Sequence, residues 1–254
     1  MCNKRNPDFT SDLDQLSIED TCYLNKNSKK EDTYITAFQK MYGSDKTKEK
    51  RPVISKKSDI LCITNRKLCK EGFLKRIEKI AAAKPKAIVL REKDLAEEEY
   101  KALAEKVIHI CKNYGVPCVL HSFTKVAISL NVNAIHMPLP LLRKMTLQEK
   151  RHFEVIGASC HSSEEAKEAE KLGCTYITAG HIFLTDCKKG LPGRGLAFLE
   201  QICDRSNIPV YAIGGISSTN IESVWNAGVS GACMMSGLMT CINVKETLAG
   251  LERQ

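Results

Sequence analysis

The chain from residue 60 onward alternates short apolar runs with longer stretches in which apolar residues recur at helical spacing. In the first of these stretches the apolar positions are Phe73, Leu74, Ile77, Ile80 and Ala81, which predicts an amphipathic helix. Later stretches stop at Gly115, Gly173 and Gly228, as helices commonly do. The expected strands are residues 60–64, 87–90, 118–120, 134–135, 155–159, 176–179, 209–213 and 232–235.

Strands that are apolar throughout and lie between helices are typical of a parallel sheet buried on both faces. Eight strand–helix units within residues 60–254 predict a closed (β/α)8 TIM barrel, for which about 200 residues is the lower end of the usual size. An open doubly wound sheet is the alternative. It is disfavoured because no Gly-x-Gly-x-x-Gly follows the first strand, where a dinucleotide-binding fold would carry it.

Residues 1–59 differ from the rest of the chain in composition and in hydrophobic pattern. They are rich in Lys, Asp, Asn and Ser, and their apolar residues are isolated. Such a segment buries too little apolar surface to offset its ordering entropy, so we expect a flexible or loosely docked N-terminal extension ahead of the barrel domain, residues 60–254. The alternative is a docking segment or lid that uses Tyr34, Phe38 and Tyr42.

Composition excludes several classes of protein. No run reaches the roughly 18–20 apolar residues of a membrane span, and the first residues lack the apolar core of a secretory signal, so we expect a cytoplasmic protein with no membrane contact. Twelve scattered cysteines without a Cys-x-x-Cys pair indicate reduced thiols and no metal site.

The formal net charge of +8 is spread along the chain, and residues 60–254 hold 26 basic and 20 acidic side chains. This mild excess suits a small anionic ligand and lacks the clustered basic stripe of a nucleic-acid-binding protein. The sequence is compatible with a homo-oligomer.

Titratable side chains gather where the expected strands end. His121, His136, His161 and His181 come at the ends of the third to sixth strands. Arg91 and Lys93 follow the second strand in the same way. Active sites of TIM barrels form at the carboxyl ends of the strands, so this pattern predicts one site for an anionic molecule. His109 and His152 fall elsewhere in the pattern and are expected to be structural.

Two glycine-containing loops predict a phosphate site. Gly214-Gly215 follows the seventh strand and Ser236-Gly237 follows the eighth. Loops after these two strands commonly hold phosphate in TIM barrels, because bare backbone N–H groups can approach the anion closely. The loop after the sixth strand adds His181, Thr185 and Lys188.

Five ordered motifs across residues 60–254 resemble the thiamine phosphate synthase/TenI superfamily of thiamine-biosynthetic barrels. They are Leu-Arg-Glu-Lys at 90–93, Ile-Gly-Ala-Ser-Cys-His-Ser at 156–162, Gly-His-Ile-Phe-Leu-Thr-Asp-Cys-Lys at 180–188, Pro-Val-Tyr-Ala-Ile-Gly-Gly-Ile at 209–216 and Met-Met-Ser-Gly at 234–237. The resemblance does not extend to residues 1–59.

The resemblance implies two activities, and departures from the pattern separate them. Thiamine phosphate synthase joins a thiazole phosphate to an aminopyrimidine pyrophosphate with Mg²⁺, and its pattern has Asn-Asp-Asp where this chain has His121-Ser122-Phe123. Its His-Leu-Gly-Gln-x-Asp corresponds to His-Met-Pro-Leu-Pro-Leu at 136–141, and its Gln before the Arg-x-Lys motif corresponds to Val89. Because Mg²⁺ prefers oxygen ligands, these replacements speak against the synthase.

The loop at residues 180–195 is similar instead to TenI-type thiazole tautomerases, which aromatise a carboxylated thiazole phosphate tautomer by proton transfer. By this resemblance His181 is the catalytic residue, since histidine titrates near neutral pH and needs no metal. The phosphate-binding residues would be Gly214, Gly215, Met235 and Ser236. The other substrate-binding residues would be Arg91, Lys93, His121, Ser159, His161, Thr185 and Lys188.

The resemblance therefore favours a thiazole tautomerase that acts on a small thiazole phosphate carboxylate without a cofactor. Two alternatives stay open. One is a thiamine phosphate synthase, which alone would require Mg²⁺. The other is a non-catalytic regulator that senses the ligand and uses residues 1–59 as a docking arm.

Overall fold

The computed structural model describes residues 58–253 except 186, 187 and 189. Residues 1–57 lie outside the described part. The expected extension, including its alternative as a lid with Tyr34, Phe38 and Tyr42, therefore stays a prediction.

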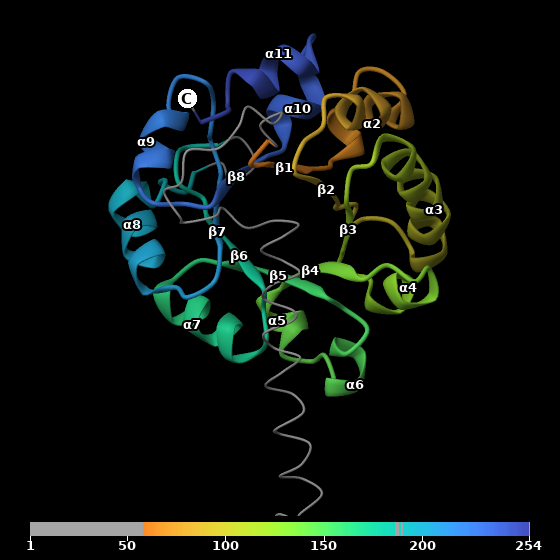
Figure 1. The fold of residues 1–254 in the computed structure, drawn as a ribbon, viewed down its shortest axis with the longest axis horizontal. Helices are drawn as coiled ribbons and strands as arrows, with labels where there is room; N and C mark the ends of the chain where they lie inside the picture. The colour runs from red at the N-terminus through yellow and green to blue at the C-terminus, as the bar shows by residue number, and fades with distance from the viewer. Residues whose placement is uncertain (1–57, 186–187, 189, 254) are drawn as a thin grey trace, which may run out of the picture.

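Eight parallel strands form a closed barrel in chain order, with β1 paired to both β2 and β8 (Figure 1). The predicted (β/α)8 fold is confirmed. The strands are β1 (Ile60–Ile63), β2 (Ala87–Leu90), β3 (Cys118–His121), β4 (Ala134–Pro138), β5 (Val155–Cys160), β6 (Tyr176–Gly180), β7 (Val210–Ile213) and β8 (Gly231–Met234).

Helices surround the strands as an outer ring (Figure 1). The larger ones are α2 (Phe73–Ala82), α3 (Glu97–Tyr114), α7 (Ser163–Lys171) and α8 (Gly195–Arg205). The shorter ones are η1 (Arg66–Leu68), α4 (Thr124–Ser129), α5 (Leu139–Leu142), α6 (Leu147–Lys150), α9 (Ile221–Asn226), α10 (Ser236–Thr240) and α11 (Val244–Ala249). The glycine stop after α3 is as predicted, because Gly115 adopts the left-handed conformation at its C-cap.

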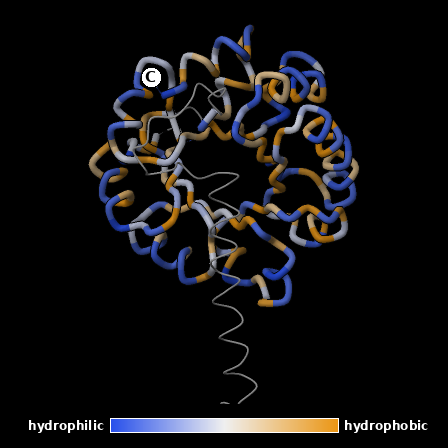
Figure 2. Tube along the Cα trace, in the orientation of Figure 1, coloured by the Kyte–Doolittle hydropathy of each residue, from blue (hydrophilic) through white to orange (hydrophobic). Residues whose placement is uncertain are grey.

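The apolar strands supply two separate layers of core. Successive side chains of a strand point to opposite faces, so Ile60 and Cys62 of β1 pack outward with helix residues such as Ile77. Leu61 and Ile63 point inward and pack with inner-facing residues of the other strands. Figure 2 shows the apolar strands inside and the more polar helical faces outside. Burial on both faces explains why the strands read as continuous apolar runs.

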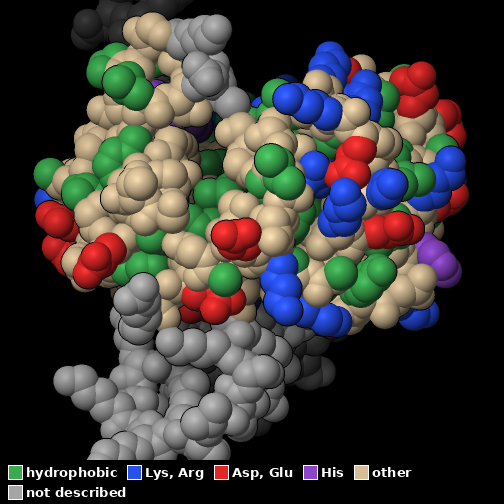
Figure 3. All heavy atoms as spheres, turned by 90° about the horizontal axis from the view of Figure 1, so that it is seen from above, with side chains coloured by type: hydrophobic (Ala, Val, Ile, Leu, Met, Phe, Trp, Pro, Cys, Tyr) green, Lys and Arg blue, Asp and Glu red, His purple; other side chains and the backbone are tan. Residues whose placement is uncertain are grey.

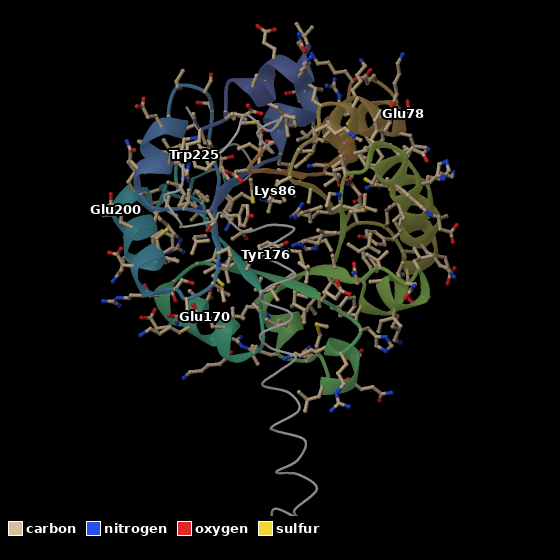
Figure 4. The ribbon with its side chains drawn as sticks, viewed as in Figure 1. Glu78, Lys86, Glu170, Tyr176, Glu200 and Trp225 are labelled. Atoms are coloured by element: carbon tan, nitrogen blue, oxygen red, sulfur yellow. The ribbon has the colours of Figure 1, made fainter. Side chains whose placement is uncertain are left out.

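Two tyrosines fill the amino-terminal half of the barrel interior. Tyr176 and Tyr211 lie edge to face with ring centroids 5.6 Å apart, and both are almost fully buried. Each ring lies over a glycine of a paired strand: a Cβ on Gly157 would come within 2.1 Å of Tyr176, and one on Gly231 within 2.3 Å of Tyr211. Figure 4 shows Tyr176 inside the ring of strands. The two rings therefore fill the interior at the amino-terminal ends of the strands.

The described residues carry free thiols and side chains of both charges. Among the described residues no helix is long and apolar enough to cross a membrane. The nine described cysteines are free thiols. In the view of Figure 3, side chains of both charges intermingle on the half of the molecule at the right.

Candidate active site

A cavity of about 470 Å³ opens at the carboxyl ends of the strands, a volume typical of small-molecule sites. All twelve residues predicted for the site line it, although they come from six different β/α units. They are Arg91, Lys93, His121, Ser159, His161, His181, Thr185, Lys188, Gly214, Gly215, Met235 and Ser236. Their roles in binding and catalysis stay predictions.

His181 follows β6 directly and is largely buried, with 7% of its surface exposed. Its Nε2 lies 3.3 Å from the carbonyl oxygen of Leu191. A carbonyl can only accept, so Nε2 carries the proton and Nδ1 of the neutral ring holds the lone pair. Nδ1 is buried and has no hydrogen-bond partner among the described residues. The imidazole is thus held in one tautomer with its Nδ1 unpaired, in a residue that lines the cavity.

Gly214 allows the loop after β7 to pack directly against His181. A Cβ on Gly214 would come within 2.4 Å of the His181 Cβ, and the glycine has a φ of +104°. The two loops are also joined by backbone hydrogen bonds from Ile182 N to Ile213 O and from Phe183 N to Gly214 O, each 3.0 Å. The glycine after β7 therefore serves the position of His181 as well as the predicted phosphate site.

His136 is one of the strand-end histidines whose pattern predicts the site, but the resemblance assigns it no individual role. It lines the cavity, and its two ring nitrogens each lie 2.9 Å from a hydroxyl, Nδ1 from Tyr176 and Nε2 from Ser159. The ring stacks against His121 with centroids 5.5 Å apart. His121 in turn pairs through Nδ1 with the Ser122 hydroxyl at 2.7 Å. The sequence feature that marks it is its place at the end of an expected strand, which it shares with the other three histidines.

The two stacked histidines are held in the neutral form. Burial lowers the pKa of His136 to about 3, with further contributions from the positive charges of Lys93 and Arg91. Burial likewise lowers the pKa of His121, assisted by His136, Lys93 and Arg91. Each ring can then donate one hydrogen bond and accept one, as hydroxyl partners permit.

These shifts predict a loss of stability in mild acid. In the unfolded chain both rings protonate below their ordinary pKa near 6.5, whereas the folded barrel keeps them neutral. The free energy of unfolding should therefore fall as the pH drops from about 6.5 toward 4, by about 1.4 kcal/mol per pH unit for each histidine. Chemical denaturation at several pH values measures the slope.

His136→Gln should make this slope shallower by about one proton. His152→Gln is the matched control, because His152 is exposed and should leave the slope at the parental value. Parallel slopes for the parent and His136→Gln would contradict the neutral assignment of His136.

Three cations face the cavity from two loops. Arg91 and Lys93 follow β2, and Lys188 comes from the loop after β6. Burial lowers the pKa of Lys93, with Arg91 and Lys188 adding repulsion. Positive groups that destabilise one another in this way are stabilised by a bound anion. The cavity wall is therefore suited to an anionic ligand group in addition to a phosphate.

The cavity does not offer the ligands that Mg²⁺ prefers. Of the side chains lining it in the described part of the chain, one is a carboxylate, Glu165. Glu165 already accepts from the backbone N–H of His161 at 2.6 Å and contacts its ring Nδ1 at 3.2 Å. Mg²⁺ sites in proteins are built on carboxylate oxygens, and three cations in the wall oppose a further positive charge. The donor set of the described part of the cavity wall does not fit a magnesium site.

Comparison with known proteins identifies the class of this cation-lined (β/α)8 barrel. The family model described as thiamine monophosphate synthase (TMP-TENI) matches residues 60–238. The chain belongs to this family. Its expected resemblance to the thiamine phosphate synthase/TenI superfamily is confirmed.

Individual relatives carry synthase names. A thiamine-phosphate synthase of Clostridium acetobutylicum is 32% identical over 188 residues, covering 72% of this chain and 88% of the relative. A putative thiamine-phosphate synthase 2 of Aquifex aeolicus is 32% identical over 177 residues, covering 70% and 95%. The solved thiamine phosphate pyrophosphorylase of Pyrococcus furiosus superposes with a TM-score of 0.65 at 26% identity, covering 76% of this chain and 92% of that structure.

These names support an enzyme of thiamine biosynthesis. They favour the synthase alternative over the tautomerase that the loop at residues 180–195 predicts. The names and the donor set of the cavity therefore point to different members of one family.

Proposed function

We propose that this chain is a thiazole tautomerase, which aromatises a carboxylated thiazole phosphate by moving a proton without a metal ion. The observation that carries the proposal is His181, which lines the cavity and whose buried Nδ1 has no partner among the described residues. A general base must lie within hydrogen-bond reach of the proton that it removes. An imidazole whose other nitrogen is already engaged by Leu191 O meets this need.

The rest of the cavity suits the groups of that substrate. The loops at Gly214-Gly215 and Met235-Ser236 would take the phosphate through backbone N–H groups and the Ser236 hydroxyl. Arg91, Lys93 and Lys188 would balance the carboxylate. The neutral rings of His121 and His136 form a wall beside these cations, against which a heteroaromatic ring can pack.

The reaction needs one proton removed and one returned. Nδ1 of His181 takes the proton from ring C2 of the substrate, while its Nε2–H stays bonded to Leu191 O. The electron pair of the broken C–H bond moves into the ring, and the exocyclic double bond takes up a proton at its outer carbon. Negative charge that develops during this shift is stabilised by the nearby cations. The same imidazolium supplies the returned proton, so His181 ends in its starting form.

The second candidate is a thiamine phosphate synthase, and the relatives' names support it. Against it stand the single, already engaged carboxylate in the described cavity wall and Val89 in place of the glutamine. The third candidate, a ligand-sensing regulator, would bind without turnover.

One set of assays separates the three. The full-length chain is given the carboxythiazole phosphate tautomer, and in a parallel reaction the thiazole phosphate with the aminopyrimidine pyrophosphate, each with Mg²⁺ or with EDTA. We expect aromatic thiazole at equal rates with and without EDTA, and no coupled product. Mg²⁺-dependent coupled product would establish the synthase instead, and ligand binding without either product would establish the regulator.

A further inference from the structure

Glu92 lies between the two cations Arg91 and Lys93 but faces away from them. Both neighbours line the cavity, whereas Glu92 is 2% exposed and its side chain reaches across to the end of β1. A buried carboxylate is costly unless it is fully hydrogen-bonded, so its partners indicate why it is there.

The partners of Glu92 form a latch between the β1 and β2 loops. Its Oε1 accepts from the Thr64 hydroxyl at 2.7 Å and from the Arg66 backbone N–H at 3.0 Å. Its Oε2 accepts from the Arg66 guanidinium at 3.1 Å. The Thr64 oxygen accepts in turn from the backbone N–H of Arg91 at 2.9 Å. Thr64 therefore links the carboxylate to the residue that begins the cation pair.

The same contacts determine which groups the negative charge of Glu92 stabilises. The Arg66 guanidinium is paired on its other side with Asp94, at 2.6 and 2.8 Å. These two carboxylates raise the pKa of Arg66, Asp94 more than Glu92. With Glu92 bound to Arg66 and Thr64, its charge is turned away from its two chain neighbours.

We propose that Glu92 and Thr64 are positioning residues that hold Arg91 and Lys93 over the cavity as an anion-binding pair. The latch fixes the backbone at Arg91 and keeps the Glu92 carboxylate from neutralising the pair. The identity of the anion, the substrate carboxylate, rests on the proposed function. The latch itself does not.

The first test reads the surroundings of Lys93 without any ligand. The pH dependence of Lys93 acylation by an amine-reactive ester, followed by peptide mass spectrometry, reports the pKa of this amine. The groups that face it are Arg91, Lys188, His121 and His136. Thr64→Val removes only the linking hydroxyl and should shift the Lys93 titration upward by about half a pH unit or more, because the relaxed loop separates the exposed amine from Arg91 and Lys188.

Thr64→Ser keeps the hydroxyl, and Asp94→Asn removes the charge that pairs with Arg66 and Lys67 outside the latch, so both should retain the parental titration. Glu92→Gln is the second variant if Thr64→Val does not fold, and it should shift the titration in the same direction. Equal titrations for Thr64→Val and Thr64→Ser would overturn the latch, as would an unshifted Glu92→Gln.

The second test uses turnover of the carboxythiazole phosphate. Thr64→Val should raise KM about tenfold, the effect of losing one well-placed hydrogen bond to a charged group, with kcat within about twofold. Thr64→Ser should restore the parental KM. A fall in kcat at constant KM would overturn the positioning role. If the parent chain does not turn this substrate over, the proposed function fails, whereas the Lys93 titration still decides the latch.

Discussion

Replacing His181 by alanine is expected to lower kcat for tautomerisation by about 10²- to 10⁴-fold while the barrel stays folded and still binds the aromatic product. A positioned general acid–base contributes about this much to a proton-transfer reaction. The cavity otherwise keeps its three cations and its glycine loops, which would hold the carboxylate and the phosphate. Steady-state kinetics measures the rate, and calorimetry measures product binding.

His152→Ala is the matched control, because this histidine is exposed and lies in the connection before β5. It should retain the parental kcat. His181→Gln offers a side chain of similar reach that cannot act as a base at neutral pH, and it should be as impaired as the alanine variant. An unimpaired rate in His181→Ala would remove His181 from the mechanism and with it the tautomerase proposal.

Gly214→Ala is expected to be a strongly damaging single-methyl change in the cavity wall. The new Cβ would come within 2.4 Å of the Cβ of His181, and a φ of +104° is strained for any residue with a side chain. The strained backbone conformation alone should lower the free energy of unfolding by about 1–3 kcal/mol. Because His181 must move to relieve the clash, kcat should fall by about 10²-fold or more, as misplacements of about 1 Å commonly cause. Denaturant unfolding and steady-state kinetics measure the two effects.

Gly173→Ala separates strain from displacement. Gly173 follows α7 with a φ of +87°, and a Cβ there would meet nothing within 4 Å. This control should lose a similar backbone contribution to stability and keep full activity. Equal activities of the Gly214 and Gly173 variants would show that the loop after β7 does not position His181.

The preference for a tautomerase depends on what replaces the synthase pattern. At the end of β3 the chain carries a neutral histidine bonded to Ser122, and at β4 a neutral histidine bonded to Tyr176 and Ser159. These groups fill the wall without negative charge, so the cations of Arg91, Lys93 and Lys188 are left for an anion rather than shared with a metal ion. The relatives carry synthase names, whereas the described cavity wall of this chain holds a single carboxylate, Glu165.

The sequence by itself determined the architecture and most of the cavity wall. Strand and helix signals are local, because they depend on the spacing of apolar residues within one segment. Eight strand–helix units imply closure, and closure brings all strand ends to one face. Residues directly after strands, such as Arg91, His181 and Gly214, were therefore predictable as one group.

Only the tertiary structure decided what depends on register and on contacts between units. The role of His136 follows from facing Tyr176 and Ser159, which belong to other strands. The free nitrogen of His181 follows from a carbonyl ten residues later, and its position follows from a glycine of the next β/α unit. From the sequence alone, Glu92 could be a third charged residue of an Arg-Glu-Lys site. In the folded chain its carboxylate instead contacts Thr64 and Arg66. These are non-local hydrogen bonds and packing contacts, and no periodicity in a single chain segment encodes them.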